Sequence, residues 1–178
     1  MSFTRGRLIR HLLVIFLAGS VAPADSNTPQ YSFLTTDGEL VFRFPSSPSL
    51  DRDLNITVEK SPCSNARYTA KGKGYLFGAI ILDCPAYDMA AHSDEVFKQM
   101  DDMFRQMDTP IFGHDDKLHD IAGSKVKAKE VLGRKGEIRA HNRIFVRAHS
   151  TVTLSALWDS RDPALAAAAI VFLNSMTQ

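Results

Sequence analysis

Residues 75–82 read Tyr-Leu-Phe-Gly-Ala-Ile-Ile-Leu, the most apolar of the β-prone segments in this chain. A short continuous apolar run of this kind is typical of a strand that is buried on both faces. We therefore expect it to lie centrally in a sheet. Three further β-prone segments, at 39–44, 54–58 and 67–71, precede it and are separated by Pro- and Gly-containing breaks. Residues 39–83 are thus predicted to form an antiparallel meander.

The hydrophobic period changes after this meander. Apolar side chains recur at helical spacing between Val96 and Met107, which predicts an amphipathic helix over 92–108. Ser93 is a plausible N-cap for that helix. Residues 111–124 are then expected to form a polar connection.

Three alternating segments follow and predict three more strands, at 125–131, 137–148 and 151–158, with a hairpin turn at 133–136. Asp162-Pro163 starts a final helix that runs to residue 175, because an N-cap followed by proline favours helix initiation. The residues of this helix that are expected to face inward are Leu165, Ala169, Phe172 and Leu173.

The order of elements is strands, helix, strands, helix. This order predicts the α+β class, with a mainly antiparallel sheet and helices packed on it. The sequence shows no internal repeat and no second boundary, so residues 38–178 are expected to form a single domain.

The first 24 residues are typical of a secretory signal peptide. Three arginines precede an apolar run at 12–18, and residues 22–24 read Ala-Pro-Ala. The run is far shorter than the ~20 apolar residues that span a bilayer, and no later segment is long and apolar enough. We therefore predict no transmembrane segment after cleavage, with residues 25–37 as a leader and first turn. An uncleaved anchor or a first buried helix is the alternative.

The charge balance excludes a polyelectrolyte. The chain has 21 Lys and Arg against 20 Asp and Glu, and loss of residues 1–24 removes three cations and leaves a net charge of −2. An exported chain of this charge is not expected to bind nucleic acid. The expected location is the periplasm or the extracellular medium.

Cys63 and Cys84 are the only cysteines. Because an exported protein enters an oxidising compartment, we predict a disulfide between them. Two cysteines at this spacing do not form a zinc site, and the chain has no C-x-x-C motif.

Residues 38–45, Gly-Glu-Leu-Val-Phe-Arg-Phe-Pro, precede a proline-broken loop and resemble the F-x-F-P-x-x-P opening of PsbP-like α/β/α sandwich proteins. The predicted helix at 92–108, Gly123 before a strand and the final helix agree with that pattern over residues 38–175. The resemblance implies an α/β/α sandwich. It also implies an accessory, binding or assembly factor that has neither a catalytic centre nor a cofactor of its own.

A basic stripe is the main candidate for function. Eight cations lie between Lys125 and Arg147, and only Glu130 and Glu137 oppose them. A hairpin that presents this stripe would bind a protein or an anionic partner in the cell envelope. The alternative is edge protection, in which lysines on an exposed strand prevent aggregation. The predicted partner-binding residues are Lys125, Lys127 and Lys129, which alternation places on one side of their strand, together with Arg134, Lys135 and Arg139.

The alternative function is a small periplasmic hydrolase or metal-dependent enzyme. Its candidate residues are Asp88 and His92, together with the loop that carries His114 and His119. However, histidines five residues apart do not share a helix face, and Lys117 between them would repel a cation. The chain also lacks a nucleophile motif such as G-x-S-x-G. We therefore predict a non-enzymatic binding or assembly module without a metal or cofactor.

Overall fold

The computed structural model describes residues 31–34, 41–106, 111–121 and 124–177. Within these ranges, side chains are not described for 31–34, 53–56, 100–101, 103–106, 111–121, 124–125 and 177. The predicted signal peptide at 1–24 lies outside the described residues.

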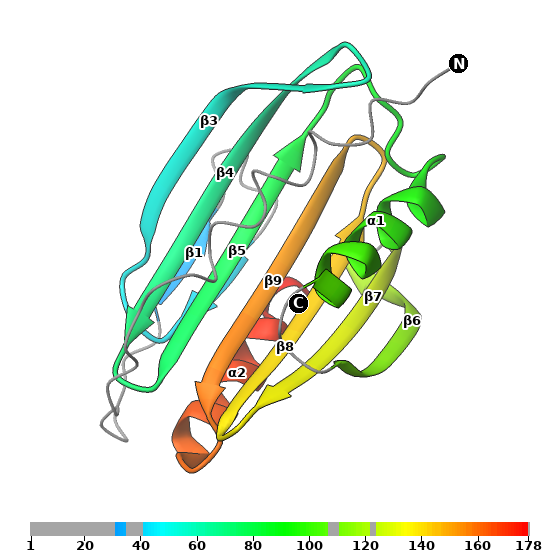
Figure 1. The fold of residues 1–178 in the computed structure, drawn as a ribbon. Helices are drawn as coiled ribbons and strands as arrows, with labels where there is room; N and C mark the ends of the chain where they lie inside the picture. The colour runs from blue at the N-terminus through cyan, green and yellow to red at the C-terminus, as the bar shows by residue number, and fades with distance from the viewer. Residues whose placement is uncertain (1–30, 35–40, 107–110, 122–123, 178) are drawn as a thin grey trace.

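Seven strands form one antiparallel sheet, in the spatial order β3-β4-β5-β9-β8-β7-β6 (Figure 1). Two meanders make up this sheet, one of β3 to β5 and one of β6 to β9, and they join where β5 pairs with β9. The strands are β3 Ser49–Val58, β4 Ser61–Gly72, β5 Tyr75–Asp83, β6 Ile111–Ile121, β7 Ser124–Lys135, β8 Ile138–Val146 and β9 Ser150–Asp159.

Two short strands, β1 Tyr31–Leu34 and β2 Val41–Phe44, pair as a separate hairpin. The Phe42 and Phe44 side chains of β2 are fully buried, and the Phe44 ring lies 4.9 Å from that of Phe172. The hairpin therefore completes the core around the C-terminal helix rather than extending the main sheet.

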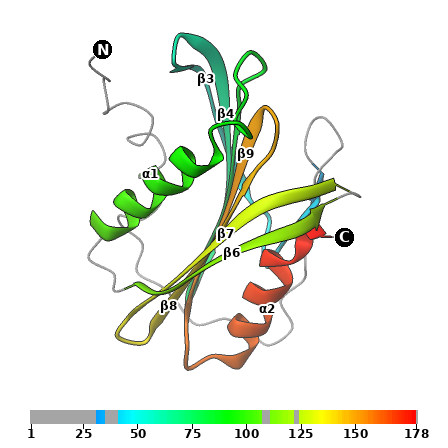
Figure 2. The same ribbon diagram turned by 90° about the vertical axis from the view of Figure 1, so that its right-hand side faces the viewer.

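The two α-helices, α1 Ser93–Gln106 and α2 Pro163–Leu173, lie on opposite faces of the sheet (Figure 2). A short 3-10 helix, η2 Ser175–Thr177, follows α2. Asp162 caps α2, because its Oδ1 accepts hydrogen bonds from the backbone N–H groups of Ala164 and Leu165 at 2.9 and 3.3 Å. The inward face predicted for this helix is confirmed, since the buried residues of α2 are Leu165, Ala169, Phe172 and Leu173.

The two faces of the central strand β9 differ in character. Val152, Leu154 and Ala156 lie in the apolar core beneath α2. Thr151, Thr153 and Ser155 alternate with them, and each is also buried. A purely apolar core therefore exists only on the α2 side of this strand.

The predicted α+β class, an α/β/α sandwich, was wrong. The described residues form a largely β fold with nine strands and only two α-helices, of 14 and 11 residues. The main cause is residues 111–124, which were expected to be a polar connection. Residues 111–121 instead form β6 and pair along β7, so that the sheet widens to seven strands while each face has a single helix.

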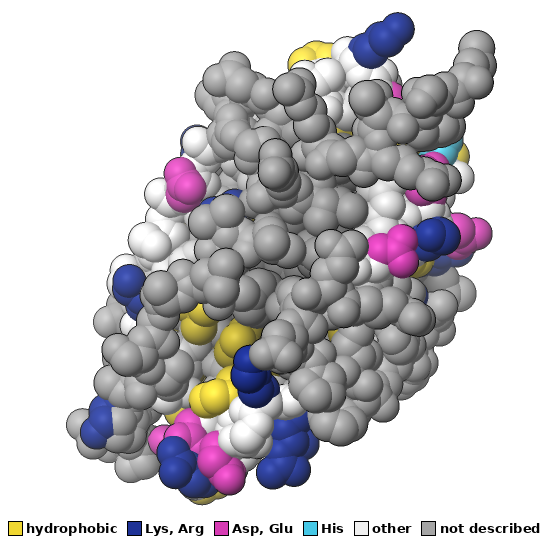
Figure 3. Space-filling view, viewed as in Figure 1, with side chains coloured by type: hydrophobic (Ala, Val, Ile, Leu, Met, Phe, Trp, Pro, Cys, Tyr) yellow, Lys and Arg dark blue, Asp and Glu magenta, His cyan; other side chains and the backbone are white. Residues whose placement is uncertain are grey.

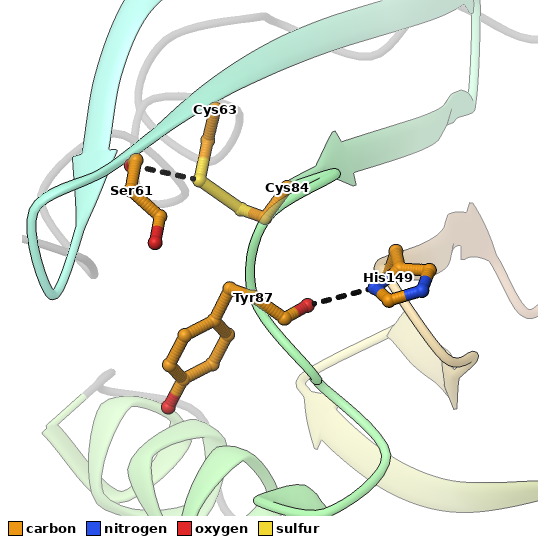
Figure 4. Close-up of a disulfide and its surroundings, with 5 residues drawn as sticks. All are labelled: Ser61, Cys63, Cys84, Tyr87 and His149. Atoms are coloured by element: carbon orange, nitrogen blue, oxygen red, sulfur yellow. Dashed lines mark hydrogen bonds between the residues drawn. A yellow bond between two sulfur atoms is a disulfide. The ribbon is translucent and has the colours of Figure 1, made fainter.

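The disulfide between Cys63 and Cys84 is present (Figure 4). It joins the residue before Ser64 to the residue after Asp83, directly beyond the Ser64–Asp83 pair of β4 and β5, and the two Cα atoms are 4.3 Å apart. Both cysteines are buried in the smaller core that also contains Phe97 of α1. The bond thus locks the open end of the β4–β5 hairpin.

Two variants of α2 test the core. Phe172 is fully buried and its ring stacks on that of Phe77, with centroids 5.2 Å apart, so Phe172→Ala should lower the free energy of unfolding by about 3–5 kcal/mol. Ile170 on the same helix is 61% exposed, and Ile170→Ala should lower it by less than about 1 kcal/mol. Urea unfolding measures both values, and equal losses would contradict the assignment of the buried face.

Replacing both cysteines by alanine should lower the free energy of unfolding by about 3 kcal/mol, because the bond closes a loop between residues 21 positions apart. Urea unfolding with and without reductant measures this loss. Reductant should bring the wild-type protein to the stability of the variant and leave the variant unchanged. A variant as stable as the oxidised protein would show that the bond is dispensable.

Candidate functional site

Three connections from distant parts of the chain meet at one end of the sheet. The Asp159 N–H donates to the Gly74 carbonyl and the Ser160 N–H to the Glu137 carbonyl, each at 2.8 Å. The β4–β5 turn, the β7–β8 turn and the β9–α2 connection therefore form one continuous surface, at the lower end of Figure 1.

This end of the molecule is rich in cations. The cations come from β4, from the turn after it, and from both strands of the β7–β8 hairpin, and all are exposed except one, which is half-buried. Dark blue side chains lie there in Figure 3, together with magenta ones. We call these five residues the basic end: Lys71, Lys73, Arg134, Lys135 and the half-buried Arg139.

Two acids at the same end, Asp159 and Asp162, have partners of their own. The Arg161 Nε donates to Asp159 Oδ1 at 2.9 Å, and these hydrogen bonds lower the pKa of Asp159 to about 2. Asp162 is engaged as the N-cap of α2. Glu137 lies close enough to Arg161 to raise the pKa of that guanidinium, after the larger effect of Asp159. Asp159 and Asp162 are thus engaged, whereas the exposed Glu137 offsets part of the positive charge of the basic end.

The β7–β8 turn differs from the one predicted at 133–136. Strand β7 continues through Lys135, and the chain turns at Gly136 and Glu137. Gly136 has a φ of 58°, which a glycine adopts without strain. The Arg134 Nε donates to the Gly136 carbonyl at 2.9 Å, so the turn also orients this side chain.

The turn places aromatic and basic residues in one row across the sheet. Arg134 lies directly opposite Arg139, Arg139 opposite Trp158, and Trp158 opposite Tyr75. Residues in directly opposite positions have Cβ atoms about 4.5–5.5 Å apart. Two arginines are thus cross-strand neighbours in a row that continues to Trp158, and arginine side chains suit recognition of an anion.

The predicted lysines of β7 have a different environment. Lys127 Nζ donates to Ser93 Oγ at 3.1 Å and lies 3.4 Å from Asp94 Oδ1. Lys129 is only 7% exposed, and its Nζ lies 5.9 Å from the centroid of the Phe97 ring. The alternation of side chains along β7 does place Lys127 and Lys129 on one face of the sheet, as predicted. Helix α1 lies against that face. The side chain of Lys125 is outside the described residues.

Edge protection, the alternative explanation of these lysines, was wrong. Strand β7 is not an edge strand, because it pairs with β6 on one side and β8 on the other. Lys127 and Lys129 instead contact α1 from the sheet. The residues predicted to bind a partner therefore divide into a group that contacts α1 and a group at the basic end.

A buried ionic cluster was missed by the sequence analysis. Glu130 Oε1 accepts from Arg143 Nε at 2.7 Å, and Glu130 Oε2 lies 3.3 Å from His141 Nε2. Arg143 Nη1 also donates to the Leu173 carbonyl and to Asn174 Oδ1, both at 2.9 Å. The cluster fixes the C-terminal end of α2 to the sheet. The observed turn at Gly136 and Glu137 places Arg143 directly opposite Glu130. The turn predicted at 133–136 implies a different register, so the sequence analysis did not find this pair.

Burial and charge shift the pKa values in this cluster. Burial alone would raise the pKa of Glu130, but Arg143 and His141 outweigh it and hold that pKa below its ordinary value. Burial lowers the pKa of His141, although Glu130 opposes the change. The favoured state at neutral pH is a charged Glu130–Arg143 pair beside a neutral His141.

The residues proposed for an enzyme have local structural contacts. Asp88 Oδ1 accepts from the Ala91 N–H at 3.0 Å, and the His92 ring stacks on Tyr87 with centroids 5.0 Å apart. His149 Nδ1 lies 3.2 Å from the Tyr87 carbonyl oxygen (Figure 4). Partial burial raises the pKa of Tyr87, and the charges of Glu59 and Glu95 add to this effect.

The side chains of His114 and His119 lie outside the described residues. In the part of the chain whose side chains are described, no three His, Cys, Asp or Glu residues are grouped so that they could hold a metal ion. Neither α-helix there has the length and apolar character that crossing a bilayer requires.

Comparison with known proteins gives no family assignment. No protein-family model matches this chain, and no curated protein matches it significantly. The resemblance to PsbP-like proteins therefore stays a prediction from the sequence. The geometry of the basic end is the observation on which a function can be argued.

The ionic cluster predicts acid sensitivity. In the unfolded chain His141 takes up a proton near its ordinary pKa of 6.5, whereas in the folded protein it does so only at lower pH. The unfolded state therefore binds more protons as the pH falls below about 6.5, and stability decreases. Glu130, whose folded pKa is also lowered, adds a further loss below about 4.5.

Thermal unfolding between pH 8 and pH 5 measures this effect. His141→Gln should reduce the decline in midpoint between pH 7 and pH 5. His149→Gln, which changes an exposed histidine, serves as the matched control. Identical pH profiles for wild type and His141→Gln would show that this histidine does not contribute.

Proposed function

We propose that this protein is an exported, non-enzymatic binding module that engages an anionic partner through its basic end. The observation that carries the proposal is the convergence of Lys71, Lys73, Arg134, Lys135 and Arg139 on one surface. After loss of residues 1–24 the chain as a whole carries a net charge of −2. Its positive charge is therefore concentrated locally rather than spread over the molecule.

The electrostatics of this arrangement favour association with anions. Exposed charges act over a Debye length of about 10 Å at 0.1 M salt, so several cations on one surface act together on a bound or approaching anion. Such a surface increases the rate of encounter and selects partners by charge. Asp159 pairs with Arg161 and Asp162 caps α2, so among the acids at this end Glu137 is the one that offsets part of the charge.

The proposed location is the periplasm or the extracellular medium. The disulfide supports it, because such bonds form and persist in oxidising compartments. The predicted signal peptide supports the same location. An accessory or assembly role in the envelope is also what the resemblance to PsbP-like proteins implies.

Charge reversal at the basic end tests the proposal. Lys73→Glu/Lys135→Glu should elute from a heparin column at a salt concentration about 0.1 M lower than the wild-type protein, because two reversals change the local charge by about four units. The control is Lys60→Glu/Lys98→Glu, which changes two exposed lysines in the β3–β4 turn and in α1. The two variants have the same net charge and differ in where it changes. Lys98→Glu also removes a surface ion pair with Asp102, and a pair of this kind contributes little to stability.

Equal shifts for the two double variants would show that only the net charge matters and would contradict the proposal. A wild-type protein that fails to bind heparin at 0.05 M salt would contradict it as well. Thermal unfolding of each variant checks that the fold is retained, because all four lysines are exposed.

A further inference from the structure

Arg134 and Arg139 are directly opposite each other in the β7–β8 hairpin. Like charges in this position repel and destabilise a sheet, since their Cβ atoms are only about 4.5–5.5 Å apart. Among the residues with described side chains, neither guanidinium has a carboxylate partner. A pair of arginines in this arrangement is the expected form of a site that is neutralised by a bound anion.

Two acids near the pair are engaged by other cations. Glu130, four residues before Arg134, is engaged by Arg143 and His141. Asp159, beside Trp158, is engaged by Arg161. Glu137, in the turn between the two arginines, is exposed and forms no ion pair with either guanidinium within 4.0 Å. A bound anion would place a negative charge directly beside the pair, which none of these acids does.

The turn orients one of the two guanidinium groups. The Arg134 Nε donates to the Gly136 carbonyl at 2.9 Å, so this side chain is fixed against the turn. Arg139 is half-buried and lies between Arg134 and Trp158 in the cross-strand register. A preorganised fork loses less entropy when it binds an anion than a mobile side chain does.

The geometry points to a phosphate monoester as the ligand of this pair, an inference that rests on the proposed function and specifies its chemistry. One arginine fork already satisfies a carboxylate, which has two oxygens and a single charge. Two opposed forks match an anion with three terminal oxygens and nearly two charges, and a phosphate monoester has both. Such a group occurs on soluble phosphorylated molecules and on lipids with a terminal phosphate.

Arginine-to-lysine substitution separates this specific site from a general positive field. Arg134→Lys/Arg139→Lys keeps both charges but removes the bidentate forks, so it should weaken binding of the phosphate group about tenfold. The matched control is Arg147→Lys, beyond the opposite end of β8, which should keep wild-type affinity. Calorimetry with inorganic phosphate and sedimentation with vesicles of phosphatidic acid in phosphatidylcholine are the two measurements.

Binding of inorganic phosphate that is lost in the double lysine variant supports a soluble ligand. Binding of phosphatidic acid vesicles alone, with the same loss, supports a lipid headgroup. Full affinity in the double lysine variant would overturn the inference, and so would a wild-type protein that binds neither probe. If heparin binding still depends on Lys73 and Lys135 in that case, the proposed function stands and only the phosphate specificity falls. Thermal unfolding of the lysine variant, whose charges are unchanged, confirms that it is folded.

Discussion

The pairing of β5 with β9 is the constraint on which the rest of the structure depends. It joins two meanders that are otherwise independent, and it aligns Tyr75 with Trp158 and Asp83 with Ser150. The apolar residues of both strands are buried by this pairing, together with α2. Non-local strand pairing of this kind has a high entropic cost of loop closure, which burial of a continuous core must offset.

The same pairing creates the basic end. With β5 and β9 in register, the turn before β5 and the connection after β9 must lie side by side, and backbone hydrogen bonds link them to the β7–β8 turn. Cations that are up to 68 positions apart in the chain, from Lys71 to Arg139, thereby share a surface. The chemistry of the surface follows from strand register rather than from a local sequence motif.

The faces of the sheet have separate roles. The α2 face is the larger apolar core, and Arg143 and Glu130 fasten the end of α2 to it. On the other face, Lys127 and Lys129 contact α1, while the disulfide holds the hairpin beside it. Arg143 and Glu130 thus position α2, Lys127 and Lys129 contact α1, and the basic end lies on the surface of the molecule.

The sequence by itself determined the local features: the cap and buried face of α2, the buried strand around Ile80 and the pairing of Cys63 with Cys84. Each depends on a period, a capping residue or a simple count. The tertiary structure decided the rest. Strand β6 has a polar sequence and becomes a strand because β7 offers it a partner, and Lys127 and Lys129 contact α1 because of where that helix packs. Long-range register decides both, since a shift of one residue moves every side chain to the other face.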